Sequence, residues 1–136
     1  MNKFFEISKE DIKLAEDKMG LSFPSELKRF YLTHGYGFLD SKNDNFNRIM
    51  DPMSVAHFRL HEYEYEGMES MDVYDSTSDN RLVFFEVSEG LFLSIELTTK
   101  YKQKIYLMDK VVADSLGEFL KVYPENESII FAYLDD

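Results

Sequence analysis

The 136-residue sequence contains no cysteine. This absence excludes a disulfide scaffold, a cysteine nucleophile, cysteine-ligated zinc and iron–sulfur chemistry, and it suits a reducing compartment. Long apolar runs are missing as well. The first six residues carry no apolar stretch of signal-peptide length, and no segment approaches the ~20 apolar residues of a membrane span. We therefore expect a cytoplasmic protein that does not enter a membrane.

Positive charge is scarce, because 15 Lys and Arg stand against 26 Asp and Glu, which gives a formal net charge of −11. An excess of negative charge this large repels nucleic acid and anionic membranes and favours a basic partner. The rest of the composition is that of an ordinary folded protein, with 12 Phe and 9 Tyr available for a core. The length predicts one domain over residues 1–136.

A capping signal predicts the first helix. Ser8 followed by Asp11 resembles a capping box, and Ile7 with Ile12 has the spacing of a hydrophobic staple. Gly20 is suited to end the helix in a left-handed conformation. The pattern therefore predicts a helix of about three turns between Ser8 and Gly20.

Two more helices are expected in the first half of the chain. Pro24 suits the first position of a second helix that stops near His34. Asp51 before Pro52 is the N-cap signal of a third helix. Residues 40–48, between these helices, are a polar run that we interpret as a surface loop. The predicted buried stripes are Leu27, Phe30 and Tyr31 in the second helix, and Met53, Ala56 and Leu60, flanked by Val55 and Phe58, in the third.

The second half has the pattern of a sheet followed by a helix. Residues 82–85 are a compact apolar run, and the alternation over residues 91–97 predicts a half-buried strand. With a third strand at residues 105–108, these segments form an antiparallel meander. The order of helices, then strands, then a helix predicts an α+β domain in which helices pack on a mainly antiparallel β-sheet.

The last predicted helix begins at Ser115, which forms a capping box with Glu118, and it ends before Pro124. Residues 125–136 follow it, and we expect them to dock as a final strand or a short helix. The predicted buried stripe of this helix comprises Leu116, Phe119, Leu120 and Tyr123.

The three histidines are the natural start of a search for catalysis. His57 and His61 are spaced to share a metal on one helix face. A zincin-type site needs Glu directly after the first His, but Phe58 stands there, and the sequence offers no third ligand. We interpret them as two partly exposed helix histidines, and His34 as a residue near a helix C-terminus, where a cation is favourable. We expect no metal and no cofactor.

Other sequence motifs of functional sites are also incomplete or missing. The polar run that starts at Asp40 lacks the Gly and the bidentate Glu of a calcium loop, since Asn45 and Asp51 occupy those positions. Phosphate-binding glycine motifs and a nucleophile–base arrangement are also missing, so we predict that the protein is not an enzyme. Lys100, Lys102 and Lys104 are better explained as protection of a sheet edge than as a nucleic-acid patch.

The segment 62–79 is the most unusual part of the sequence. It holds seven acids and no Lys or Arg, with Tyr and Met side chains interleaved. Carboxylates steer a basic partner and aromatic side chains supply contact area when an interface closes. A solvated helix face followed by a loop, with the aromatics turned inward, explains the same pattern equally well.

Two stretches resemble a known family. Residues 15–37 read AEDKMGLSFPSELKRFYLTHGYG. They resemble the signature of the SUKH superfamily, which includes the fungal Smi/Knr cell-wall regulators: a helix ending in Glu-x-x-x-Gly, a small-x-x-Pro entry, an aromatic second helix and a Gly-containing exit. Residues 112–120, VADSLGEFL, are similar to the closing small-Asp-Ser-Phe-x-Glu-Phe-Leu motif. His34 and Leu116 depart from the usual Asn and aromatic residue, and residues 38–80 carry no match.

The resemblance implies helices on a mainly antiparallel sheet and no catalytic residues. Bacterial single-domain members are generally immunity proteins of polymorphic toxin systems, which bind and block a cognate toxin in the cytoplasm, often a nuclease. The charge agrees with this, because a nuclease needs basic residues to hold phosphates and an acidic inhibitor would reach it quickly.

We therefore predict an immunity protein that neutralises a basic toxin by stoichiometric binding, without direct contact to nucleic acid. The sequence carries no signal for an oligomeric state. The alternative is a regulatory scaffold of the Smi/Knr type that binds signalling partners, and a toxin gene directly upstream would favour immunity. The predicted partner-binding residues are Glu62, Tyr63, Glu64, Tyr65, Glu66, Glu69, Asp72, Tyr74 and Asp75.

Overall fold

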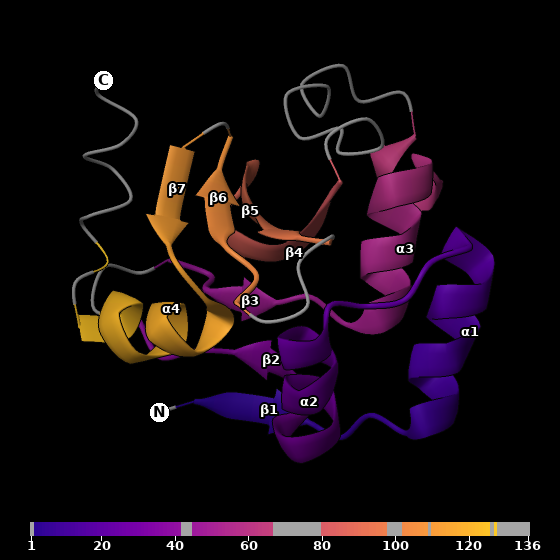
Figure 1. Cartoon of the computed structure of the whole chain (residues 1–136), viewed down its shortest axis with the longest axis horizontal. Coiled ribbons are helices and arrows are strands. Elements are labelled where there is room, and N and C mark those ends of the chain that lie inside the picture. The colour runs from indigo at the N-terminus through magenta and orange to yellow at the C-terminus, as the bar shows by residue number, and fades with distance from the viewer. Residues whose placement is uncertain are drawn as a thin grey trace.

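A seven-stranded antiparallel sheet lies at the centre of the fold (Figure 1). The computed structural model describes residues 2–41, 45–66, 80–97, 102–108, 110–125 and 127. Within them, the strands follow one another across the sheet in chain order, so the sheet is a continuous meander. The strands are β1 (Lys3–Phe5), β2 (Tyr36–Phe38), β3 (Arg48–Ile49), β4 (Arg81–Ser88), β5 (Leu91–Glu96), β6 (Ile105–Leu107) and β7 (Lys110–Ala113).

Helices pack against this sheet, which confirms the predicted α+β fold (Figure 1). Among the described residues, no helix is long and apolar enough to cross a membrane. The helices are α1 (Lys9–Met19), α2 (Ser25–His34), α3 (Pro52–Leu60) and α4 (Leu116–Val122), with 3-10 turns η1 (Tyr63–Tyr65) and η3 (Tyr123–Glu125).

The predicted order of elements is wrong in one respect. Strand β1 precedes the helices, β2 and β3 lie between α2 and α3, and β7 follows the predicted third strand of the meander. These strands are two to four residues long, which is too short for alternation to reveal them. The expected surface loop over residues 40–48 is wrong at its end, because Arg48 belongs to β3 and Asn47 has no exposed surface.

The capping signals are confirmed. The Ser8 hydroxyl accepts the Asp11 backbone N–H at 3.1 Å, the Asp11 carboxylate accepts the Ser8 N–H at 3.1 Å, and Gly20 ends α1 with φ +73°. Asp51 caps α3 and Ser115 caps α4. The predicted capping box at Ser115 is incomplete, because the Glu118 carboxylate accepts the backbone N–H of Asp114 rather than that of Ser115. Pro24 is the N-cap of α2 rather than its first residue.

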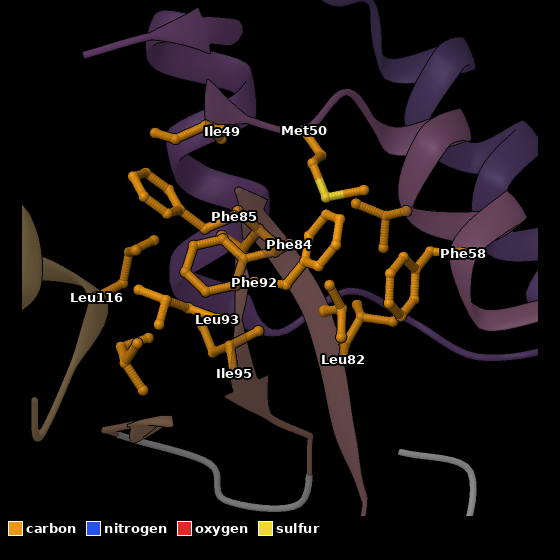
Figure 2. Packing of buried hydrophobic residues seen from close by; sticks show 14 of the residues in the cluster. Ile49, Met50, Phe58, Leu82, Phe84, Phe85, Phe92, Leu93, Ile95 and Leu116 are labelled. Carbon is orange, nitrogen blue, oxygen red and sulfur yellow. The ribbon is translucent and has the colours of Figure 1, made fainter. Parts of the chain in front are cut away.

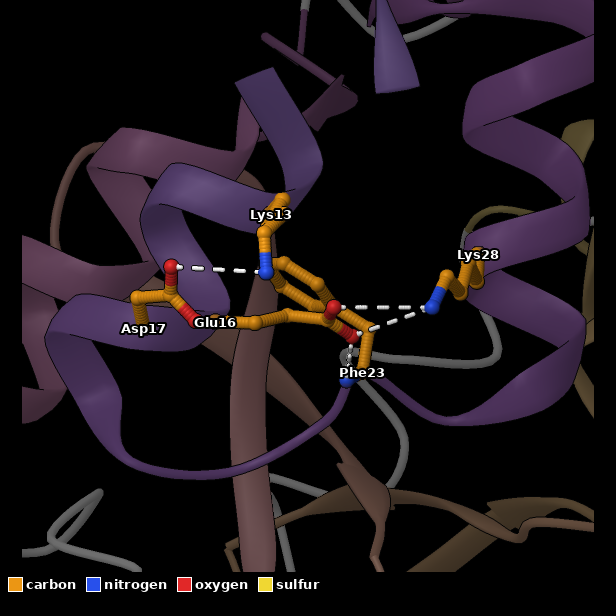
Figure 3. A network of polar contacts seen from close by, with 5 residues as sticks. All are labelled: Lys13, Glu16, Asp17, Phe23 and Lys28. Atoms are coloured by element: carbon orange, nitrogen blue, oxygen red, sulfur yellow. Dashed lines mark hydrogen bonds and ion pairs between the residues drawn. The ribbon is translucent and has the colours of Figure 1, made fainter. Parts of the chain in front are cut away.

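A carboxylate fixes the connection between α1 and α2 (Figure 3). Glu16 accepts the Phe23 backbone N–H at 2.8 Å and forms an ion pair with Lys28 at 3.4 Å. The nearby pair of Lys13 and Asp17, 3.8 Å apart, is largely exposed. A pair of that kind contributes little to stability, whereas Glu16 satisfies a backbone donor just before α2 begins.

Two predicted burial patterns need correction. In α3 the buried residues are Pro52, Val55, Ala56 and Phe58, whereas Leu60 is 39% exposed, so the buried face is rotated from the predicted stripe. In β5, Phe92 and Ser94 are buried as well as Leu93 and Ile95. The strand is therefore covered on both faces rather than half-buried, because helices lie on either side of the sheet centre.

Two glycines allow β1 to lie close to the chain that leaves α2. Gly35 has φ +90° and Gly37 has φ +144°. A Cβ atom on Gly35 would overlap the carbonyl oxygen of Phe5, and one on Gly37 would overlap that of Lys3. Glycine is therefore required here for its conformation and for its lack of a side chain.

The strand register defines two faces of the sheet from β1 to β5. Phe4 contacts the ring of Phe30 in α2, and Phe85 contacts the ring of Phe119 in α4, so α2 and α4 cover one face, the inner face. The row of paired residues on the inner face is Phe4, Gly37, Ile49, Phe85 and Leu93. The row on the opposite, outer face is Lys3, Phe38, Arg48, Glu86 and Phe92.

The outer face is covered at its β4–β5 end by α3 and η1. The Phe92 ring lies 5.0 Å from Phe58 in α3 and 6.5 Å from Tyr65 in η1. Figure 2 shows Leu116 of α4 on one side of the strand pair and Phe58 on the other. The hydrophobic core thus has two layers that share the central strands.

A buried polar cluster joins the chain before β3 to the chain after α4. The Asn47 side chain accepts the Tyr123 hydroxyl at 2.8 Å and donates to the Glu127 carboxylate. Glu127, which is 2% exposed, also accepts from the Ser41 hydroxyl at 2.7 Å. Residues 128–136 lie outside the described residues, so the predicted docking of the tail stays a prediction. Lys100 also lies outside them.

Candidate protein-binding surface

The described part of the predicted contact segment is a tight turn that follows α3. His61 ends α3 with φ +55°, and Tyr63 begins η1 with φ +56°. A non-glycine residue in this left-handed region costs conformational energy, and such residues gather at functional sites. The ring of Tyr63 packs on that of His57 at 4.4 Å, so the helix supports the turn.

The structure separates the predicted residues by exposure. Tyr63 is 72% exposed, and the side chains of Glu64 and Glu66 are exposed beside it. Glu62 is half-buried and forms an ion pair with Lys18 of α1 at 3.1 Å, which neutralises part of its charge. The remaining predicted residues, Glu69, Asp72, Tyr74 and Asp75, lie outside the described residues.

Tyr65 points inward. It is 5% exposed, and its ring packs on Phe58 at 4.9 Å. Burial, and then the negative charge of Glu64, raise the pKa of Tyr65 to about 12, so its hydroxyl is neutral near pH 7. Tyr65 therefore holds the turn to the core of the free protein and presents its neighbours Tyr63, Glu64 and Glu66 to solvent.

Two residues that the sequence did not single out lie beneath the turn. Arg48 of β3 donates to the Tyr65 hydroxyl at 3.4 Å and forms an ion pair with Glu86 of β4 at 3.5 Å. Burial raises the pKa of Glu86, Arg48 lowers it, and the charges of Glu64 and Glu89 raise it further. Only the strand register places Arg48 opposite Glu86, so sequence spacing gave no signal for this pair.

The histidines take structural positions. His57 packs on Tyr63, His61 is the C-cap of α3, and His34 is the last residue of α2, where its ring lies 4.9 Å from Phe30. In the described ranges, no three His, Asp or Glu side chains come close enough to hold a metal ion.

Comparison with known proteins places the chain in a family. The profile of the SMI1 / KNR4 family (SUKH-1) matches residues 6–122, so the chain belongs to this family and the resemblance is confirmed. The chain is 41% identical over 135 residues to a protein of Bacillus subtilis (strain 168) described as "Immunity protein YxxD". That alignment covers 99% of this chain and 92% of the relative. No solved structure matches the chain significantly.

Proposed function

We propose that this chain is an immunity protein that neutralises a cognate toxin in the cytoplasm by stoichiometric binding. The similarity to an immunity protein at 41% identity, over nearly the full length of both chains, carries this proposal. The protein acts by occupying a surface of the toxin, and it uses no catalytic residue and no cofactor. Membership of the SMI1 / KNR4 family supports the same mode of action.

The contact surface of this proposal centres on the acidic segment 62–79. Tyr63 offers an exposed aromatic ring held against His57, and Glu64 and Glu66 flank the turn with negative charge. Aromatic side chains that become buried in an interface supply much of its binding energy, and carboxylates at the rim increase the association rate. Tyr65 contributes indirectly, because its burial fixes the turn.

The toxin of this proposal is a nuclease with a basic surface. A net charge of −11 attracts a basic domain from a distance and disfavours nucleic acid itself as the ligand. The exposed acids of the turn would then face the basic groups that hold phosphates in the toxin.

Co-expression tests the proposal directly. The candidate toxin is a toxin domain encoded next to this gene. We expect cells that produce such a domain to survive only when this chain is present, and we expect the two proteins to co-purify. Failure of protection together with failure of co-purification would contradict the immunity role. Co-purification with endogenous signalling proteins instead would favour the regulatory scaffold.

A further inference from the structure

The outer face of the sheet carries aromatic side chains where the helices leave it uncovered. Phe5 and Phe38 are 41% and 40% exposed, and the ring of Phe5 lies 5.3 Å from that of Tyr36 in the paired strand. The Lys3 ammonium lies 5.8 Å from the centre of the Phe5 ring. We call Lys3, Phe5, Tyr36 and Phe38 the outer aromatic face. Clustered exposed aromatic side chains of this kind mark interaction sites.

This face is continuous with the acidic turn. Phe38 pairs with Arg48 in the neighbouring strand, and Arg48 pairs in turn with Glu86. Because directly paired residues share one side of a sheet, these side chains form a row on the outer face. Within this row, Arg48 donates to the hydroxyl of Tyr65, which follows Glu64 in the chain. An aromatic area and an acidic margin thus meet along one surface of the molecule.

Charge decides which occupant fits this surface. Two copies of a chain with net charge −11 repel one another, which disfavours a dimer across this face. The acidic margin would attract a basic protein. An apolar area on that partner would pack against the aromatic rings. An apolar centre with a charged rim is the usual anatomy of a protein–protein interface.

We propose that the outer aromatic face is the second half of the toxin-binding surface, and that the basic toxin lies across Phe5 and Phe38 while it contacts Glu64 and Glu66. The proposal rests on the proposed immunity function and adds the residues that retain the partner after encounter. The acids set the rate of association, whereas the aromatic side chains set the rate of dissociation.

The first test compares Phe38→Ser and Phe5→Ser with the control Leu32→Ser. Leu32 is 45% exposed on α2, which covers the inner face. We expect each Phe variant to bind the toxin domain about tenfold more weakly through faster dissociation, with unchanged salt dependence. We expect the control to bind within about twofold of the wild type. Far-UV circular dichroism and the melting temperature verify that each variant is folded.

A second test detects contact with the partner directly and does not require a measured change in affinity. The photo-crosslinking residue p-benzoylphenylalanine replaces Phe38 in the full-length chain, and in a control protein it replaces Leu32. We expect crosslinks from position 38 to the toxin domain and none from position 32.

Each contrary outcome is distinct. If the wild-type protein binds the toxin but the Phe variants bind equally well, this inference is wrong and the immunity function stands. If crosslinks from position 38 lead to a second copy of the chain or to residues 128–136, another occupant covers the face. If the wild-type protein neither binds the toxin nor protects the cell, the immunity function and this inference both fail.

Discussion

At the scale of single residues, the buried polar groups are the part of the molecule that sequence patterns could not locate. Asn47 stands in a polar run that resembles a solvated loop, yet its side chain bonds to Tyr123 and Glu127, about 80 residues away along the chain. Burial, and then the charge of Glu127, raise the pKa of Tyr123, which keeps its hydroxyl neutral as a donor. Such long-range partners follow only from the tertiary fold.

Asn47 therefore gives the first prediction. Asn47 has φ +48°, in the left-handed region. Asn47→Ala leaves the Tyr123 hydroxyl without its acceptor and places Ala in this left-handed conformation, so we expect a loss of roughly 2–4 kcal/mol in the free energy of unfolding. Asn47→Gly removes the same side chain without the conformational cost and should lose somewhat less. Urea unfolding measures both values. If both variants stay within about 0.5 kcal/mol of the wild type, the buried cluster does not stabilise the fold.

Glu86 gives a prediction of pH dependence. Because burial raises its pKa in the folded state, its contribution to stability is present below the unfolded pKa and is lost as pH rises through the folded pKa. The Glu86→Gln variant has no carboxyl group to titrate at this position, so it does not lose that contribution as pH rises. We expect the free energy of unfolding of the variant, relative to the wild type, to increase from about pH 4 to about pH 7. A relative stability that is flat or decreases over this range contradicts the raised pKa.

At the scale of elements, helices were predictable and short strands were not. The caps at Ser8, Asp51 and Ser115 act through local hydrogen bonds, so their signals lie within a few residues of sequence. Strands β1, β2 and β3 acquire their partners across the sheet, and their two or three residues carry no periodicity of their own. The candidate site divides in the same way: the acids of the turn were visible, whereas Arg48 and Glu86 required the register.

Gly37 tests how closely β1 must lie to β2. Gly37→Ala would place a Cβ atom against the Lys3 carbonyl oxygen, in a backbone conformation that L-residues rarely adopt. We expect a loss of about 3 kcal/mol or more, or failure to fold. Gly20→Ala is the matched control, because Gly20 has positive φ but open space around it, and it should lose about 1–2 kcal/mol. Equal losses in the two variants would show that contact with β1 is unimportant.

The acidic turn η1 is tested by charge reversal at matched total charge. We expect Glu64→Lys combined with Glu66→Lys to slow association with the toxin domain by about tenfold at low salt and to flatten the salt dependence. The control combines Asp17→Lys with Asp114→Lys, two exposed acids outside the turn that give the same net charge. Stopped-flow kinetics compare the two. If both pairs slow association equally, net charge alone steers the toxin and the turn is not its contact site.

At the scale of the whole molecule, the proposed function assigns different roles to the two faces of the sheet. The inner face, covered by α2 and α4, holds much of the core. The outer face is closed by α3 and η1 at its β4–β5 end and carries exposed aromatic side chains at its β1–β2 end. A fold divided in this way can keep its structure while the binding surface varies with the partner.

The proposed function makes one claim about mechanism, which is that this protein holds a toxin and does not alter it chemically. The most direct measurement titrates the purified chain against its cognate toxin domain while toxin activity is followed. We predict that activity falls linearly to zero at one chain per toxin, and that the toxin recovered from the complex is active again. Loss of activity at a small fraction of that ratio, with the recovered toxin still inactive, would contradict the claim.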